Sequence, residues 1–566
     1  LEATNINNAN ITQSTLTSTN SATNGIALNG VNGTVDVNNS TVSVTNPTAN
    51  GISATNVSGT VNLAATSGSQ ISTNGTAASI SLQESTGSVN LSGLQVSSTG
   101  GAVLEATNIN NANITQSTLT STNSATNGIA LNGVNGTVDV NNSTVSVTNP
   151  TANGISATNI SGTVNLAATS GSEITTNGTA ASISLQESTG SVNLSGLQVS
   201  STGGAALEAT NINNATVTQS TLTSTNSATN GITLNGVSGT VDVNNTTVSV
   251  TNPTTNGIAA TNISGTVNLA ANSGSQISNA GSDGVRLEQV TGGLTLSGFE
   301  IADSAINGVA AVNSRNLTIQ GNTIDNSGVD GISLNNVTGI TTITNNQITN
   351  SAEDAIGLTN TTGQTELTIT QNQLDTNGSG INLSIGGDAQ VTAQIANNQI
   401  LNSSRESLLI NLLDNAQLSA TVSNNQVTNA GANPGSNGVS LVTGGNTAST
   451  FTFSDNSFTN IGNNYGFYLD TGGTSSSNFI FSNNQVTSGT GVIGGIVLEN
   501  NAPGSRLCVQ LNGNTSSGAS FVDYALSNNA GSLYQVADLL NLTVNNTGNL
   551  QFFSGPFTNV QVCPAP

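Results

Sequence analysis

The residues whose types could do chemistry gather most densely between positions 283 and 330. Paired carboxylates can cleave a glycosidic bond when they flank it as acid and nucleophile or base. The other interpretation, which we favour, is a solvated patch at the junction between two kinds of repeat. The residues concerned are Asp283, Arg286, Glu288, Asp303, Arg315, Asp325 and Asp330.

A second charged group combines Glu353-Asp354 with Arg405-Glu406. The repeat described below places these two pairs at turns about two coils apart. Such a group is typical of a solvated surface, and we interpret it that way.

Acids earlier in the chain are sparse and evenly spread. Asp36, Asp139 and Asp242 recur once per 103 residues. At four coils of about 4.8 Å each, they lie roughly 19 Å apart, too far to share a metal ion or a substrate bond. The sequence therefore predicts no metal site, no cofactor and no enzymatic activity.

The charge balance excludes several classes of partner. The chain has 27 acidic residues, four arginines, no lysine and no histidine, for a net charge of −23. A basic surface for nucleic acid or anionic lipid is therefore not expected. No apolar run is long enough to span a membrane as a helix.

A long internal repeat organises the first half of the chain. Leu1-Glu2-Ala3-Thr4-Asn5-Ile6 returns from Leu104 and again from Leu207, a period of 103 residues. The third copy fades near Val309. Because Leu1 is in phase with Leu104, we expect further coils and an export signal upstream in a longer precursor.

Each long repeat divides into four shorter units of 24 to 28 residues, which open at Ile26, Ile52, Ile80 and Leu104. Within a unit, apolar residues alternate in three short runs separated by Asn-Gly, Asn-Asn, Ser-Gly or Asn-Pro, which favour turns. Three such strands bury one face only by stacking on their neighbours. The sequence therefore predicts an all-β, right-handed parallel β-helix of about twenty coils, roughly 95 Å long at strand spacing.

A recurrent asparagine marks one corner of the later coils, as in Asn345-Asn346-Gln347-Ile348. Stacked asparagines can hydrogen-bond to those above and below them. We expect Asn39, Asn142 and Asn245 to hold the matching place in the repeats. The predicted ladder consists of Asn322, Asn346, Asn372, Asn398, Asn425, Asn456 and Asn484.

Three regions follow from these patterns: repeats at 1–308, divergent coils at 309–505 and a C-terminal cap at 506–566. The cap contains both cysteines, Cys508 and Cys563. We expect them to form a disulfide that closes a loop of about 55 residues and implies an oxidising compartment, the alternative being two buried thiols.

Fourteen of the fifteen aromatic residues follow position 450. Phe451/Phe453 and Phe479/Phe481 alternate 28 residues apart and are expected to stack in the core. Phe467 and Leu469 fill inward places, so Tyr468 should point outward. We single out Tyr465 and Tyr468 as candidate contacts for a sugar or a protein.

The coil openings, the Asn-Asn-Gln-Ile corners and the Ser/Thr/Asn/Gly-rich tandem array resemble bacterial surface β-helix proteins, namely autotransporter passengers and filamentous-haemagglutinin-like adhesins. The resemblance covers about residues 1–505. It implies an exported rod at the cell surface that mediates adhesion, self-association or matrix formation. Pectate-lyase-like enzymes and phage tailspikes share the fold, so the fold alone does not determine function.

From these observations we expect a non-catalytic extracellular rod. Its partners would be other copies of itself, side by side or end to end, or a glycan or protein of a host or matrix. The alternative is a β-helix protein that binds or cleaves polysaccharide with the acids around 283–330.

Overall fold

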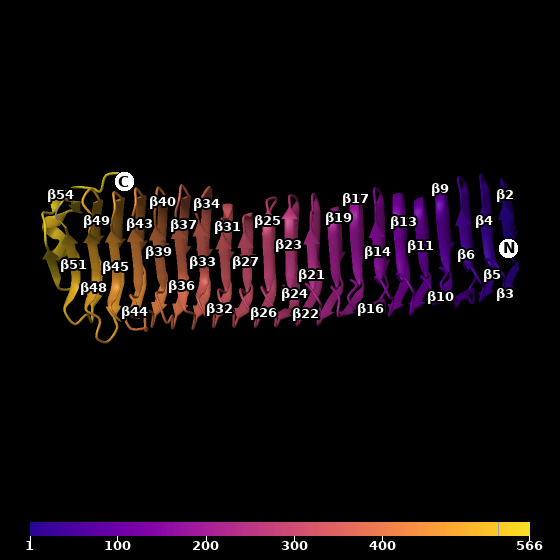
Figure 1. The fold of residues 1–566 in the computed structure, drawn as a ribbon, viewed down its shortest axis with the longest axis horizontal. Coiled ribbons are helices and arrows are strands. Elements are labelled where there is room, and N and C mark those ends of the chain that lie inside the picture. The colour runs from indigo at the N-terminus through magenta and orange to yellow at the C-terminus, as the bar shows by residue number, and fades with distance from the viewer. Residues whose placement is uncertain (530) are drawn as a thin grey trace. The chain divides into compact units, whose positions relative to one another are not determined.

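The computed structural model describes residues 1–529 and 531–566, and nearly all of its regular structure is β-strand. Two compact units make up the chain, Leu1–Gly281 and Ser282–Pro566. Within each unit, successive strands pair in parallel and lie side by side (Figure 1). The predicted all-β parallel solenoid is confirmed. The unit boundary precedes the end of the repeats predicted at 308.

Each coil of unit 1 has three strand segments, and consecutive segments often merge around a corner. The backbone turns at these corners through a left-handed residue such as Asn108 or Gln116. The second repeat shows the pattern in β11 (Leu104–Thr115), β12 (Thr118–Thr122), β13 (Ile129–Thr148), β14 (Ile155–Thr158), β15 (Thr163–Ala168), β16 (Glu173–Asn177), β17 (Ile183–Ser195) and β18 (Gln198–Thr202).

The core of unit 1 is a set of aliphatic stacks. Leu104 pairs in register with Ile80 on one side and Ile129 on the other, and all three are fully buried. Alternate residues point outward because successive side chains of a strand face opposite sides. A one-residue slip would move a whole stack into solvent, so the register is strongly specified.

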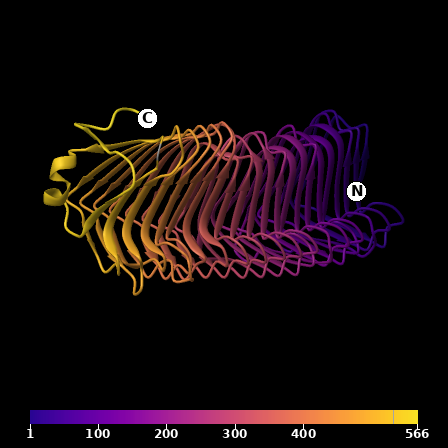
Figure 2. The same ribbon diagram turned by 60° about the vertical axis from the view of Figure 1, so that its left-hand side comes forward.

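Unit 2 has the same coil plan, with parallel strands stacked coil on coil (Figure 2). Its first strands are β25 (Val285–Val290), β27 (Val309–Val312), β30 (Ile332–Asn335), β33 (Asp354–Asn360), β36 (Ser379–Ile385), β39 (Leu408–Leu412), β42 (Val439–Thr443), β45 (Tyr465–Thr471), β48 (Gly494–Asn500), β51 (Val522–Asn528) and β53 (Leu550–Phe553). Its second strands are β26 (Leu294–Ala302), which also forms the third segment of its coil, β28 (Arg315–Gln320), β31 (Thr338–Thr344), β34 (Gln364–Thr370), β37 (Gln390–Ala396), β40 (Gln417–Ser423), β43 (Ala448–Ser454), β46 (Ser476–Ser482), β49 (Arg506–Asn512), β52 (Leu533–Ala537) and β54 (Thr558–Val560). Its third strands are β29 (Thr323–Asp325), β32 (Gln347–Thr349), β35 (Gln373–Asp375), β38 (Gln399–Leu401), β41 (Gln426–Thr428), β44 (Ser457–Ile461), β47 (Gln485–Ser488) and β50 (Thr515–Ser517).

An asparagine column runs along unit 2 between the second and third strands. The backbone N and the side-chain Nδ2 of Asn372 both donate to Oδ1 of Asn398 at 3.0 Å, and Nδ2 also donates to Ile343 O at 2.9 Å. The seven asparagines of the column are at most 2% exposed. They are Asn322, Asn346, Asn372, Asn398, Asn425, Asn456 and Asn484, and the column continues through Asn514 to Asn546.

The place predicted for Asn39, Asn142 and Asn245 is wrong by one residue. Asn39 has a left-handed backbone (φ 53°) and an exposed side chain, whereas Ser40 is fully buried. Ser40 Oγ accepts from Ser14 N at 3.1 Å, the role that Oδ1 has in the asparagine column. The left-handed corner residue turns its side chain to solvent, so the following residue points into the corner. Ser143 and Thr246 occupy this position in the other repeats.

The predicted cap boundary at 506 is also wrong, because the coil continues beyond it. Strands β49 and β52 pair in parallel with their predecessors β46 and β49. Gly513 (φ 70°) is the left-handed residue before Asn514, and the sequence marker is lost because Ser516 stands in register with Val486, where earlier corners have an apolar residue. The structure that closes the end comprises the 3-10 turn η1 (Leu539–Asn541), the helix α1 (Leu542–Asn545), β53, β54 and the tail.

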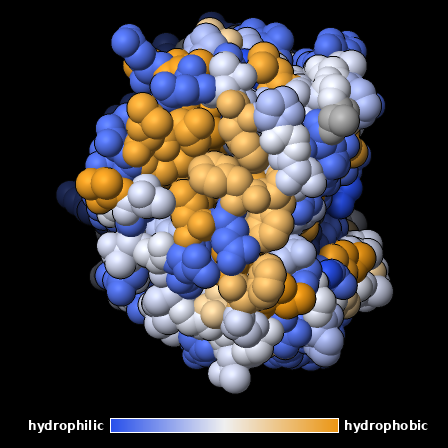
Figure 3. All heavy atoms as spheres, turned by 90° about the vertical axis from the view of Figure 1, so that its left-hand side faces the viewer, coloured by the Kyte–Doolittle hydropathy of each residue, from blue (hydrophilic) through white to orange (hydrophobic). Residues whose placement is uncertain are grey.

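The end of unit 2 combines this short cap with the predicted disulfide, which is confirmed between Cys508 and Cys563. Figure 3 shows a broad apolar patch at this end. In the cap, the side chains of Leu540 and Val544 are 84% and 80% exposed.

Candidate functional site

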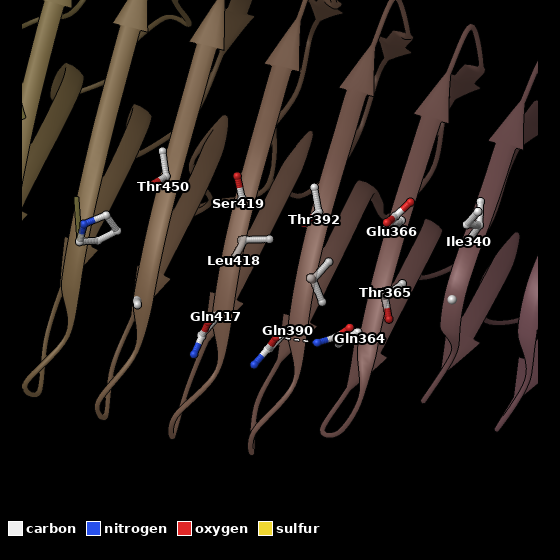
Figure 4. A pocket seen from close by; sticks show the side chains of 14 residues that line it. Ile340, Gln364, Thr365, Glu366, Gln390, Thr392, Gln417, Leu418, Ser419 and Thr450 are labelled. Atoms are coloured by element: carbon white, nitrogen blue, oxygen red, sulfur yellow. Dashed lines mark hydrogen bonds between the residues drawn. The ribbon is translucent and has the colours of Figure 1, made fainter. Parts of the chain in front are cut away.

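A shallow groove of about 590 Å³ crosses the outer face of the second strands of unit 2. Figure 4 shows its floor, which extends over β31, β34, β37, β40 and β43. Two rows of outward side chains form this floor, one per strand because the strands are in register. The first row is Gln364, Gln390 and Gln417, and the second is Glu366, Thr392, Ser419 and Thr450.

The groove offers amide and hydroxyl groups and little charge. Gln364 Nε2 donates to Gln390 Oε1 at 3.1 Å. Among the described residues that line the groove, Glu366 has the only charged side chain. Side-chain amides both donate and accept hydrogen bonds. The groove therefore offers hydrogen-bond donors and acceptors that suit contact with a neutral polar chain.

The acids between 283 and 330 that the sequence suggested as a candidate site lie at two different corners of the coil. Asp283, which is buried, contacts Arg286 (Oδ2 to Nη1, 3.3 Å), and Arg286 also contacts Glu288 (3.4 Å). Arg315 is exposed on β28. The arginine beside Asp283 neutralises a charge that would be costly to bury alone.

Asp303 and Asp325 lie at the other corner, at the ends of third strand segments. Asp303 Oδ1 accepts from Asn326 Nδ2 at 2.5 Å. Asp325 Oδ1 accepts from Thr349 Oγ1 at 2.6 Å and from Asn350 Nδ2 at 2.8 Å. Both carboxylates are thus hydrogen-bonded to the following coil.

A second column, which the sequence analysis missed, joins some of these acids at the start of the first strands. Asn307 N and Nδ2 donate to Asp283 Oδ1 at 3.1 and 2.9 Å. Asp330 N donates to Asn307 Oδ1, and Asp354 N donates to Asp330 Oδ1, both at 3.1 Å. The detectable signal was an Asn or Asp two residues before several of the buried coil openings, as at Asn24 before Ile26 and Asn50 before Ile52.

Further charged groups surround Asp330 and Asp354. Arg405 forms ion pairs with Glu353 and, at 3.8 Å, with Asp354. The structure thus brings the second predicted group together across two coils, although Glu406 contacts Asn437 instead. Burial raises the pKa of Asp330, and the nearby charges of Asp354 and Glu353 add to this, against hydrogen bonds from Asp354 N and Ser333.

We expect Asp330→Asn to raise the melting temperature of unit 2 at pH 7. A carboxyl group whose pKa is raised in the fold binds its proton more tightly there than in the unfolded chain, so its contribution to stability falls as pH rises through the folded pKa. Asparagine keeps an acceptor for Asp354 N and has no charge to bury. The gain should shrink toward pH 4, near the ordinary aspartate value of 3.8.

Tyrosine fluorescence during heating measures this effect, because all aromatic residues lie in unit 2 and the chain has no tryptophan. Glu366→Gln, on the exposed face of β34, controls for loss of a surface charge. A lower melting temperature for Asp330→Asn at pH 7, or a difference independent of pH, would contradict this interpretation.

The two tyrosines singled out from the sequence lie on β45. Phe467 and Leu469, which flank Tyr468 in sequence, are fully buried. Tyr468 therefore projects from the outer face of the strand. The rings of Tyr465 and Tyr468 stack, with centroids 5.2 Å apart and planes 20° apart. Phe451, Phe453, Phe479 and Phe481, by contrast, are in the core.

The outer face of unit 1 carries two regular polar surfaces. On the second strands, Asn62 Nδ2 donates to Asp36 Oδ1 at 2.6 Å and Asn90 Nδ2 donates to Asn62 Oδ1 at 2.8 Å. On the third strands, threonine and serine point outward in register, as where Thr120 pairs with Ser97 and Ser146. We call the outward Thr and Ser of the third strands in unit 1 the hydroxyl face.

Among residues 1–529 and 531–566, no group of three His, Cys, Asp or Glu side chains could hold a metal ion. None of the helices described is long and apolar enough to cross a membrane.

Comparison with known proteins supports the coil geometry. Residues 230–400 match the family model described as a right handed beta helix region. Neither the curated proteins nor the solved structures gave a match. Over residues 1–529 and 531–566 the structure forms about 21 turns, and the protein is a right-handed parallel β-helix.

Proposed function

We propose that this protein is a non-catalytic extracellular scaffold that mediates adhesion by associating with other copies of itself. The observation that carries the proposal is the hydroxyl face, which repeats every 103 residues. Thr118, Thr120 and Thr122 of one repeat correspond to Thr15–Thr19 and Thr221–Thr225 in the others. Repeated weak contacts multiply into avidity when they form together.

The charge of unit 1 is compatible with close approach of two copies. Residues 1–281 contain nine acidic residues and no lysine or arginine. The acids are spread along the chain, so at physiological salt, where charges are screened over about 8 Å, repulsion between copies is modest. Asn62 donates to Asp36 and Asn90 donates to Asn62, whereas Thr17, Thr120 and Thr223 of the hydroxyl face are at least partly exposed.

The alternative, a polysaccharide-cleaving protein, has less support. The acids at 283–330 hydrogen-bond to neighbouring coils or pair with Arg286. The groove on β31–β43 favours binding without cleavage. The disulfide is compatible with export to an oxidising compartment.

The test places like charges on the hydroxyl face of the full chain. We expect the native protein to associate with rising concentration in sedimentation velocity and light scattering. Replacing Thr17, Thr120 and Thr223 together by glutamate should weaken association about tenfold at low salt, because facing carboxylates repel. About 1 M salt should restore most of it, since the screening length is then about 3 Å.

The matched control replaces the same three threonines by serine, which keeps the hydroxyl groups. Association should then stay close to that of the native protein. A native chain that remains monomeric at the highest concentration tested would refute self-association, and an unaffected glutamate variant would refute the hydroxyl face as its surface.

A further inference from the structure

Strands β48 and β51 belong to the row of first strands near the C-terminal end of unit 2. Their outer side differs from the rest of the coil surface. Val497, Val522 and Ala525 are outward residues of β48 and β51, yet each is at most 5% exposed. They are covered by Tyr465, Tyr468 and Phe553, which pack against them. An apolar cluster outside the coil is therefore present in addition to the core.

The stacked tyrosines form the accessible part of this cluster. Both rings are partly exposed, and their near-parallel stack presents a flat aromatic surface. Gly494 leaves room beneath the stack, because a Cβ at that position would lie 3.3 Å from Cδ1 of Tyr465. Along the adjoining turns, Ile493 and Phe521 are 49% and 62% exposed and extend the apolar edge.

A polar rim borders the tyrosines on one side. Tyr468 Oη donates to Glu499 Oε2 at 3.0 Å. Asn501 Nδ2 donates to Glu499 Oε2 at 2.9 Å and to Asp470 Oδ1 at 3.0 Å. Asp470 and Glu499 are partners in register on neighbouring strands. These bonds leave Asp470 Oδ2 and Glu499 Oε1 as further acceptors, since a carboxylate has about four acceptor positions.

The electrostatics of the rim restrict what can bind. Burial raises the pKa of Asp470, and the charge of Glu499 adds to the rise. Among the ion pairs of the described residues, none involves Asp470 or Glu499. The rim accepts hydrogen bonds and repels anions, so sulfated or uronic-acid polymers are disfavoured.

We propose that Tyr465, Tyr468, Asp470 and Glu499 form a binding subsite for a neutral sugar residue of a polysaccharide. The C–H face of a sugar ring stacks on a tyrosine face, and its hydroxyl groups donate to the carboxylates. Binding sites of this kind are mostly apolar with a few placed polar groups. Tyrosine suits them because its ring is apolar and its tip is polar. The proposal goes beyond self-association and does not depend on it.

Titration of the full chain with dextran, laminarin, mannan and galactomannan, followed by tyrosine fluorescence and by calorimetry, tests the proposal. We expect saturable binding of at least one of these neutral glycans and weaker or no binding of polygalacturonate. Tyr465→Ala and Tyr468→Ala should each weaken binding about tenfold or more. Tyr468→Phe keeps the ring and should lose less.

Two control variants locate the site. Tyr524→Phe alters a buried tyrosine of β51 and should leave binding unchanged. The pair Gln390→Ala and Gln417→Ala alters the groove of Figure 4 and tests whether the glycan binds there instead of at the tyrosines. Each variant is first compared with the native protein by thermal unfolding, and only those with a native melting curve are scored.

Three results would overturn the proposal. These are no saturable binding of any of the four neutral glycans, binding that survives Tyr465→Ala, and tighter binding of polygalacturonate than of the neutral polymers. Loss of binding in the glutamine pair but not in the tyrosine variants would assign the glycan to the groove instead. Native self-association with no glycan binding would refute this subsite and leave the proposed function standing.

Discussion

Replacing Asn398 by alanine is expected to lower the free energy of unfolding of unit 2 by about 3–5 kcal/mol. The side chain makes four hydrogen bonds in a buried position. Oδ1 accepts from N and Nδ2 of Asn372, and Nδ2 donates to Ile369 O and to Asn425 Oδ1. Alanine leaves several of these groups buried without a partner, at a cost of about 1–3 kcal/mol each.

The measurement combines thermal unfolding by tyrosine fluorescence with hydrogen exchange of the peptides around residues 369–425. A loss of this size corresponds to a fall in melting temperature of roughly 10 °C for a unit of about 285 residues. Exchange should rise most in the coils beside Asn398, because the stability of a stacked coil depends on its nearest neighbours.

Two matched variants separate the asparagine column from a general effect of substitution. Asn398→Ser introduces the residue that unit 1 uses at this corner, where Ser143 Oγ accepts from Ser117 N at 3.2 Å. We expect it to lose about half as much stability as the alanine variant. Asn446→Ala removes an exposed asparagine and should change stability by no more than about 0.5 kcal/mol. If Asn398→Ala matched Asn446→Ala, the column would not stabilise the fold.

Loss of the Cys508–Cys563 disulfide is expected to destabilise the C-terminal coils by about 4 kcal/mol. The bond closes a loop with a sequence separation of 55, and the chain-entropy model gives that value for a loop of this length. It also holds the tail on the outer face of β46 and β49, where Pro564 O accepts from Asn478 Nδ2 at 2.8 Å and from Arg506 Nη2 at 3.0 Å.

The cap should respond first when the bond is absent. Phe557 packs against Tyr534 and Phe552, with ring centroids 4.9 and 5.1 Å away, and lies six residues before Cys563. We expect Cys563→Ala to lower the urea midpoint reported by tyrosine fluorescence and to expose the region after residue 538 to chymotrypsin. Unit 1 contains no aromatic residue, so its contribution is followed by circular dichroism.

Reductant provides the control for this prediction. The native protein in reductant should behave like Cys563→Ala. The double variant Cys508→Ala/Cys563→Ala should not respond to reductant at all. Equal urea midpoints for the native protein and the variants would show that the coils beyond Cys508 are held by their strand pairing and core alone.

Much of the fold followed from local patterns. The alternation at Ile26, Leu28, Val35 and Val37 determined which side chains are buried, and the spacing of the coil openings determined which of them stack. The alternation and the spacing can both be read from neighbouring repeats in the sequence, because a coil buries its apolar face only against an adjacent coil with the same pattern. The corner motif located Asn322 to Asn484 for the same reason, since a buried amide needs an equivalent partner above and below.

Other features were decided only by the tertiary structure. Whether Asn39 or Ser40 enters the corner depends on which residue adopts the left-handed conformation, and the sequence has polar residues at both places. Asp470 and Glu499 are 29 residues apart in a region of unequal turns, so only strand register brings them together beside Tyr468. The sequence by itself determined the coil and its core, because burial imposes a period. Only the folded chain decided which outward residues meet, because their meeting depends on turn lengths that no period constrains.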